Sequence, residues 1–273
     1  MSDNPLLLQR ATINPYLAAA NLIFHRLRWD LDPQSFKSRS RLRALRNAHE
    51  GEKAVILCNG PSLNKVDFDS LEGTFCFGLN KINLLFERGA FRPDCIVSVD
   101  MVVVEQNAAF YNDTGLPLFI TAHGRNLVKP RKNVTFVHPA GIHKFARDVT
   151  FSVFEGHTVT FVALQLAFHM GFGEVALVGA DHNFAVKGPA NSMTIATGRD
   201  ESHFDPNYFS GGVVQTLPNL AGSEAAYAMA RDAYAAHGRR IVNATEGGKL
   251  EIFERMPLDR FLDRASGTAA GQE

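Results

Sequence analysis

Residues 54–63 of the chain read AVILCNGPSL, an apolar run that stops abruptly at a turn. A short apolar run bounded by turn residues is typical of a buried strand in a parallel sheet. The turn combines the permissive backbone of Gly60, the fixed φ angle of Pro61 and the hydroxyl of Ser62. In open α/β sheets, ligands bind at the carboxyl ends of strands, where free N–H groups can hold a phosphate. The stretch therefore predicts a strand followed by a phosphate-binding turn, with an ordinary strand-to-helix turn as the alternative.

The alternation of strand and helix patterns continues to residue 243. We expect strands at residues 53–58, 74–79, 95–99, 118–122, 134–137, 174–178 and 240–243, and helices at residues 81–88, 158–170 and 223–237. Strands that alternate with helices indicate a mainly parallel sheet. The predicted fold class is α/β and Rossmann-like, with helices on both faces of the sheet. Residues 183–221 are polar and lack a clear period, which indicates a long lid loop.

The sequence divides into three parts. Residues 1–50 are predicted to form an N-terminal helical extension, in which Asn14 caps a first helix and residues 36–48 form a second, basic helix. Residues 51–264 form the Rossmann-like domain, and residues 265–273 a disordered tail. The basic side chains of the extension either face solvent or contact an anionic membrane face or an acidic partner. The extension could also serve an oligomer interface.

Composition narrows the class of protein. The 273 residues are 45% hydrophobic, enough for a large core, and 28 basic residues balance 28 acidic ones. A general nucleic-acid binder normally shows a basic excess, so we expect no nucleic-acid partner. The three cysteines form no CxxC pattern and are expected to be reduced thiols. No signal-peptide pattern or membrane-spanning run is visible, which predicts a cytoplasmic protein, at most peripheral to the inner membrane.

Polar residues follow four of the predicted strands. They are Asn59, Gly60, Pro61 and Ser62 after the first strand, Asn80 after the second, Asp100 after the third, and Asp181 and His182 after the strand at residues 174–178. Because the carboxyl ends of parallel strands share one edge, these residues predict a ligand cleft. Asn59 and Asn80 suit ribose hydroxyls or a base edge, whereas Asp100 either ligates Mg²⁺ or caps a helix. Asp181 and His182 are candidates for an acid–base or sugar-binding pair.

Two further segments carry candidate chemistry. Thr158 is a predicted N-cap of the buried helix, whose positive end would offer a second anion site. Residues 201–209, ESHFDPNYF, contain His203, which suits general-base work, and Tyr208, which could donate to a phosphate oxygen. The alternative is that these aromatic residues only hold the loop down. The absence of HExxH, GxxxxGK[ST] and GxGxxG patterns argues against a zinc site, a P-loop kinase and a common dinucleotide-binding fold.

Several of these motifs together resemble the MptE-like family. The resemblance rests on residues 59–63 (NGPSL), 93–100 (PDCIVSVD) and 171–182 (GFGEVALVGADH), and it extends over about residues 52–255. The family is named after an archaeal 6-hydroxymethylpterin diphosphokinase and includes motility-accessory-factor proteins linked to flagellin glycosylation. The order of motifs is also similar to that of the Campylobacter-type bacterial sialyltransferases.

The resemblance implies roles for individual residues. It places Asn59, Gly60 and Ser62 at the nucleotide phosphates and ribose, Asn80, Thr158 and Thr160 at the donor, Asp181 at the Gly-x-Asp strand end, and His203 as the base that deprotonates an acceptor hydroxyl. Where the sialyltransferases carry Phe-Tyr after that Asp, this chain has His182 and Asn183. Their lid also carries a second His, which is absent here, so the identity of the base stays open. Asp100 leaves Mg²⁺ binding open as well.

Three functions fit these expectations. The first is a glycosyltransferase that moves a nonulosonic or other acidic sugar from a CMP-activated donor to a glycan or protein hydroxyl in glycoconjugate synthesis. The second is a Mg²⁺-dependent diphosphokinase of the pterin type, which converts ATP to AMP. The third is a nucleotide-sugar-binding protein without catalysis. In each case we expect no tightly bound cofactor, and Mg²⁺ only if Asp100 is a ligand.

Overall fold

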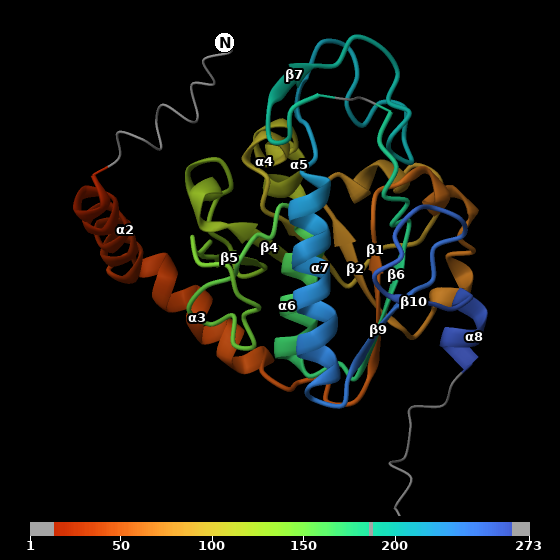
Figure 1. Cartoon of the computed structure of the whole chain (residues 1–273), viewed down its shortest axis with the longest axis horizontal. Helices are drawn as coiled ribbons and strands as arrows, with labels where there is room; N and C mark the ends of the chain where they lie inside the picture. The colour runs from red at the N-terminus through yellow and green to blue at the C-terminus, as the bar shows by residue number, and fades with distance from the viewer. Residues whose placement is uncertain (1–13, 186–187, 264–273) are drawn as a thin grey trace, which may run out of the picture.

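The computed structural model describes residues 14–185 and 188–263, and its centre is an eight-stranded sheet (Figure 1). The strands are β1 (Lys53–Leu57), β2 (Phe75–Leu79), β3 (Cys95–Ser98), β4 (Leu118–Thr121), β5 (Val134–Val137), β6 (Glu174–Val178), β9 (Arg240–Asn243) and β10 (Glu254–Arg255). Their order is β10-β9-β6-β1-β2-β3-β4-β5, and every neighbouring pair is parallel. This confirms the predicted α/β class with a parallel sheet.

Helices pack on both faces of the sheet, as the sequence predicted. The α-helices are α2 (Pro15–Asp30), α3 (Pro33–Leu45), α4 (Met101–Gln106), α5 (Ala108–Asp113), α6 (Val159–Met170), α7 (Leu220–Ala235) and α8 (Leu258–Asp263); the 3₁₀ helices are η1 (Pro61–Lys65), η2 (Asp69–Leu71), η3 (Ile82–Leu85) and η4 (Ala122–Asn126). Strand residues alternate between two cores because successive side chains point to opposite faces. Ile56 joins the core under α6 and α7, whereas Leu57 joins the core under η1, α4 and α8.

The buried helix α6 connects the core to the carboxyl edge of the sheet. Its 12 residues are almost all buried, and Gly171 ends it with a left-handed φ of 100°. Tyr234 of α7 donates a hydrogen bond of 2.8 Å to the carbonyl oxygen of Leu164, which ties the two helices together. At the start of α6, the hydroxyls of Thr158 and of Tyr227 on α7 lie 3.3 Å apart, so α7 also contacts the end of α6 that faces the strand ends.

The N-terminal extension is helical over its described part, as predicted. Asn14 caps α2 and Pro15 begins it. Helix α3 covers the edge strand β5, where the N–H of Phe136 donates to the Ser38 hydroxyl at 3.0 Å and Leu42 is buried. Covering an edge strand protects its unpaired N–H groups from other chains. The expected start of the extension and the expected tail at residues 265–273 lie outside the described residues.

Three local predictions differ from the structure. The helix expected at residues 81–88 is only the single 3₁₀ turn η3, because Asn80 has a φ of 49° and Lys81 a ψ of 33°, so the chain enters the segment in a turn. The lid contains a short antiparallel pair, β7 (Met193–Ile195) and β8 (Val214–Thr216). The short elements α4, α5, α8 and β10 were not predicted.

None of the described helices combines the length and apolarity that crossing a membrane requires.

Candidate functional site

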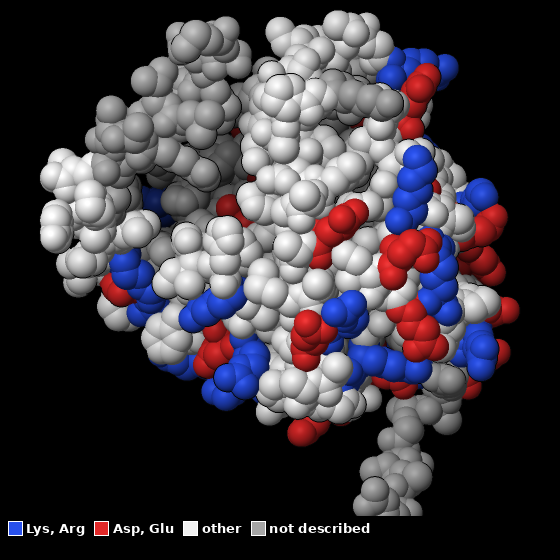
Figure 2. All heavy atoms as spheres, in the orientation of Figure 1, with Lys and Arg blue, Asp and Glu red and all other residues white. Residues whose placement is uncertain are grey.

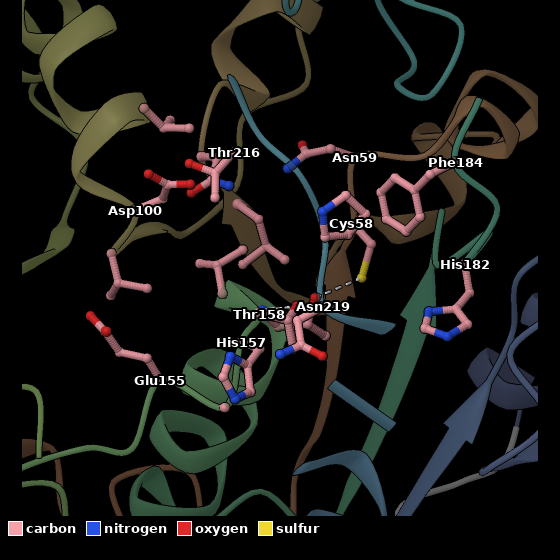
Figure 3. A pocket seen from close by; sticks show the side chains of 18 of the residues that line it. Cys58, Asn59, Asp100, Glu155, His157, Thr158, His182, Phe184, Thr216 and Asn219 are labelled. Atoms are coloured by element: carbon pink, nitrogen blue, oxygen red, sulfur yellow. Dashed lines mark hydrogen bonds between the residues drawn. The ribbon is translucent and has the colours of Figure 1, made fainter. Parts of the chain in front are cut away.

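A cavity of about 660 Å³ opens at the carboxyl ends of β1, β2, β3 and β6, beneath the lid. Of the predicted site residues, it is lined by Asn59, Gly60, Asn80, Asp100, Thr158, Thr160, Asp181, His182, His203 and Tyr208. Figure 3 shows Asp100 and Glu155 on one side of this cavity and His182 and Phe184 on the other, with His157, Thr158 and Asn219 between them. The strand-end residues therefore lie together at one edge of the sheet, although Pro61 and Ser62 are not among the residues that line the cavity.

The turn after β1 is clasped to the turn after β6. Ser62 donates to the same Asp181 carboxylate oxygen twice, from its backbone N–H at 3.1 Å and from its hydroxyl at 2.7 Å. The N–H of Gly60 donates to the carbonyl oxygen of Gly179 at 2.9 Å. The donors that the sequence suggested to be free for a phosphate thus have partners within the protein. A phosphate grip at this turn would require these bonds to be exchanged.

Asn59 and Asn80 both line the cavity, but their side chains differ in hydrogen bonding. The Asn59 side-chain oxygen is buried and has no hydrogen-bond partner, which is a costly state for an amide oxygen. Asn80 accepts from the Ser98 hydroxyl at 3.2 Å, and its own carbonyl oxygen accepts from Tyr111 at 2.9 Å. Asn59 is therefore the residue whose acceptor a ligand hydroxyl or amine would satisfy.

The N-terminus of α6 faces the same cavity. Thr158 caps the helix by accepting from the N–H of Thr160 at 3.3 Å, as the sequence predicted. Thr160 is buried, and its hydroxyl lies 3.6 Å from the Cys58 sulfur. Gly156 and His157 precede the cap with φ angles of 59° and 61°, which turns His157 into the cavity lining. The positive end of the helix dipole and the His157 imidazole make this wall suited to an anion.

Two carboxylates lie on the other wall. Asp100 caps α4, since its Oδ1 accepts from the N–H of Val102 at 2.8 Å, which is the capping alternative of the sequence prediction. Glu155 was not predicted, and nothing in the described part of the chain donates a hydrogen bond to its carboxyl. Burial, with a smaller contribution from Asp100, raises the pKa of Glu155 to about 7. A carboxyl poised near neutral pH can donate or accept a proton there.

A Glu155→Gln variant is expected to unfold less readily than wild type at pH 8 and equally at pH 4. The pKa of this carboxyl is raised from 4.5 to about 7 in the folded state, so its contribution to stability is fully present below pH 4.5 and is lost as pH rises through 7. The neutral amide escapes that loss, which amounts to about 2 kcal/mol after allowing for partial exposure. Urea unfolding at both pH values measures it. The exposed Glu105→Gln is the matched control, and a Glu155→Gln difference independent of pH would contradict the assignment.

His203 and Asp200 form a pair in the lid. The Asp200 carboxylate accepts from His203 Nδ1 at 2.7 Å, and also from the N–H groups of Ser202 and Phe209 at 2.8 and 3.1 Å. Burial raises the pKa of Asp200, but His203 and these N–H groups outweigh burial and hold the pKa below its ordinary value. Because a carboxylate only accepts, Nδ1 carries the proton and Nε2 is left as an acceptor. The sequence pattern indicated His203 but not Asp200, although the spacing of three residues between them was a usable signal.

The lid segment around this pair is pinned to the body of the protein. Tyr208 is buried, and its ring lies parallel to the His203 ring with centroids 4.0 Å apart, so the structure supports its alternative role as an aromatic anchor. Buried Lys81 donates to the Tyr208 carbonyl oxygen at 2.6 Å, and burial lowers its pKa to about 8. Arg88 pairs with Asp205, and the N–H of Phe204 donates to the Asn59 carbonyl oxygen at 2.9 Å. These contacts hold the lid segment that carries His203 against the rest of the protein.

Asp181 and His182 do not pair with each other. Asp181 is engaged by Ser62, and His182 Nε2 lies 2.9 Å from a Glu224 carboxylate oxygen on α7. His182 has a φ of 51°, which directs its ring into the cavity. Within residues 14–185 and 188–263, no three His, Cys, Asp or Glu residues are grouped so that they could hold a metal ion.

The fold and cavity define a Rossmann-like α/β protein with a ligand site at the carboxyl edge of its sheet. A family model described as 6-hydroxymethylpterin diphosphokinase MptE-like matches residues 33–187, more than half of the chain. The chain belongs to the MptE-like family.

The MAf glycosyltransferase from Magnetospirillum magneticum AMB-1 is similar at 17% identity with a TM-score of 0.48. The match covers 83% of this chain and 39% of that chain. No curated protein matches the sequence.

Proposed function

We propose that the protein is a glycosyltransferase that moves a sugar from a nucleotide-activated donor to an acceptor hydroxyl. The observation that carries the proposal is the Asp200–His203 pair of the lid, because His203 lines a cavity that also receives the N-terminus of α6. A base and an anion-binding helix end facing one cavity are the two groups that such a transfer needs. The family membership supports chemistry at a phosphate ester.

The proposed step uses these groups in order. His203 Nε2 takes the proton from the acceptor hydroxyl, and the oxygen forms a bond to the anomeric carbon of the donor sugar. The bond between that carbon and the phosphate oxygen breaks, and the nucleotide leaves with the electron pair. The α6 N-terminus and His157 stabilise the charge that develops on the departing phosphate, while Asp200 stabilises the imidazolium. Asn59 holds a ribose hydroxyl through its unpaired oxygen.

The donor is proposed to be CMP linked to a nonulosonic or other acidic sugar. Five of the ten histidines line the cavity: His123, His143, His157, His182 and His203. Imidazole N–H groups can donate hydrogen bonds to a donor with negative charge on both phosphate and sugar. The product would be a glycan or protein that carries the acidic sugar, and the reaction would belong to the synthesis of surface glycoconjugates.

A second function is favoured by the family description and by Asp100. In a diphosphokinase of the pterin type, Asp100 would offer one carboxylate to a Mg²⁺ that is otherwise held by the phosphates of ATP and by water. Mg²⁺ would then neutralise charge on the phosphates, and His203 would again deprotonate the attacking hydroxyl. This function makes binding of the nucleotide dependent on Mg²⁺.

Thermal unfolding with a panel of nucleotides tests the two proposals. We expect CMP and a CMP-linked acidic sugar to raise the Tm without Mg²⁺, because a ligand that binds only the folded state stabilises it. Asn59→Ala should lose most of that rise, whereas Asn21→Ala, exposed on α2 and outside the cavity, should keep it. Stabilisation by ATP with Mg²⁺ and none by CMP compounds would overturn the glycosyltransferase proposal and favour the diphosphokinase.

A further inference from the structure

Helix α2 presents an apolar stripe to solvent. Tyr16, Ile23, Phe24, Leu27 and Leu31 are between 54% and 84% exposed. At the 3.6 residues per turn of an α-helix, these five positions fall on one face within about 100° of arc. A contiguous exposed apolar face of this kind marks a surface that another body covers.

The opposite face of α2 is the one that holds it to the protein. Trp29 is buried and stacks on His138 with ring centroids 5.8 Å apart. Arg26 donates to the carbonyl oxygen of Phe151 at 2.9 Å. In Figure 1 the helix lies at the edge of the molecule, away from the central sheet. The stripe is therefore directed outward by specific contacts on the other side of the helix.

The segment that contains α2 and α3 carries a net positive charge, whereas residues 47–273 carry a net negative charge. Residues 14–46 hold seven basic and two acidic residues, a net charge of +5, whereas residues 47–273 hold 20 basic and 25 acidic residues, a net charge of −5. Arg28, Lys37 and Arg43 are exposed and form no ion pair within the described part of the chain. Figure 2 shows basic side chains, with acidic ones among them, at the lower left over the region of α3, next to the white surface of α2.

We propose that α2 and α3 dock the protein on the surface of an anionic phospholipid bilayer. The apolar stripe would enter the interface in the plane of the membrane, and the three unpaired basic side chains would contact the headgroups, as in interfacial amphipathic helices. The negative charge of the remaining chain would be repelled by the same surface, which fixes the side that approaches.

A second copy of the chain suits the apolar stripe of α2 less well than an anionic membrane does. Two copies joined through this face would bring two segments of charge +5 together. Like charges in apposition oppose association, whereas an anionic surface is complementary to this segment. The proposal is independent of the reaction that the cavity performs.

Flotation of the full chain with vesicles tests the proposal. We expect recovery with vesicles of phosphatidylcholine and phosphatidylglycerol, and much less with phosphatidylcholine alone. Ile23→Glu/Leu27→Glu and, separately, Lys37→Glu/Arg43→Glu should lower the partition coefficient by roughly tenfold or more. The matched control is Met193→Glu/Ile195→Glu, which changes two exposed apolar residues of the lid and should bind like wild type.

The variants alter exposed positions, so their thermal unfolding should match that of wild type and loss of binding cannot be ascribed to loss of fold. Equal flotation of wild type and the Ile23→Glu/Leu27→Glu variant would overturn the proposal. It would also be overturned if wild type stayed unbound and sedimented as a dimer that this variant converts to a monomer, because a second copy would then cover the stripe.

Discussion

The rate of sugar transfer by a His203→Ala variant is expected to fall by about 10²- to 10⁴-fold, the usual contribution of a general base. His203 Nδ1 donates to Asp200 at 2.7 Å, which leaves Nε2 to take the acceptor proton. The groups assigned to the donor, Asn59 and the N-terminus of α6, are untouched by this change. Nucleotide affinity should therefore be retained, and release of nucleotide from the donor measures the loss.

Two further variants test whether the loss of rate comes from the removal of the base. Asp200→Asn keeps a side chain of the same shape but removes the charge that stabilises the imidazolium, so we expect a smaller loss of kcat at unchanged KM. His25→Ala, an exposed histidine on α2, should transfer at the wild-type rate. Full turnover by His203→Ala would move the base to another group of the cavity, with Glu155 the next to test.

The sequence predicts the features of this protein that depend on residues close together along the chain. The apolar run before Asn59 gives β1, and the polar residues after each strand give the cavity edge, because parallel strands end on the same side. Thr158 as a cap and Gly171 as a helix end follow from local backbone chemistry. These features need no knowledge of distant contacts.

The parts that escaped prediction depend on contacts between distant residues. Ser62 and Asp181 are 119 positions apart, so the sequence gives no reason to expect that each satisfies the other. Glu155 is a candidate acid only because the fold buries it beside Asp100. The outward stripe of α2 depends in the same way on where Trp29 finds its partner. Local patterns thus placed the candidate site residues at one edge, while packing decided which of their polar groups stay unpaired.

A Gly179→Ala variant is expected to lose about 3–5 kcal/mol of unfolding free energy, the range of severe backbone or packing defects. Gly179 follows β6 with a φ of 71°, and a Cβ there would lie 2.4 Å from the Cys58 carbonyl oxygen and 3.1 Å from the Leu63 Cβ. The left-handed conformation costs an alanine about 1–2 kcal/mol, and the clash with the backbone of Cys58, in the turn after β1, adds to it. Urea unfolding gives the change through the midpoint at constant m.

Gly73→Ala separates the two causes, because Gly73 has a φ of 77° but no atom within 4 Å of its would-be Cβ. It should lose only the conformational cost of about 1–2 kcal/mol. Equal losses in the two variants would show that the close approach of the turns after β1 and β6 contributes nothing. A larger loss at Gly179 would mean that the Gly-x-Asp motif serves first as a clasp: its glycine lets the turns meet, and Asp181 then holds Ser62. The clasp in turn fixes Asn59, the neighbour of Gly60, with its unpaired oxygen at the cavity.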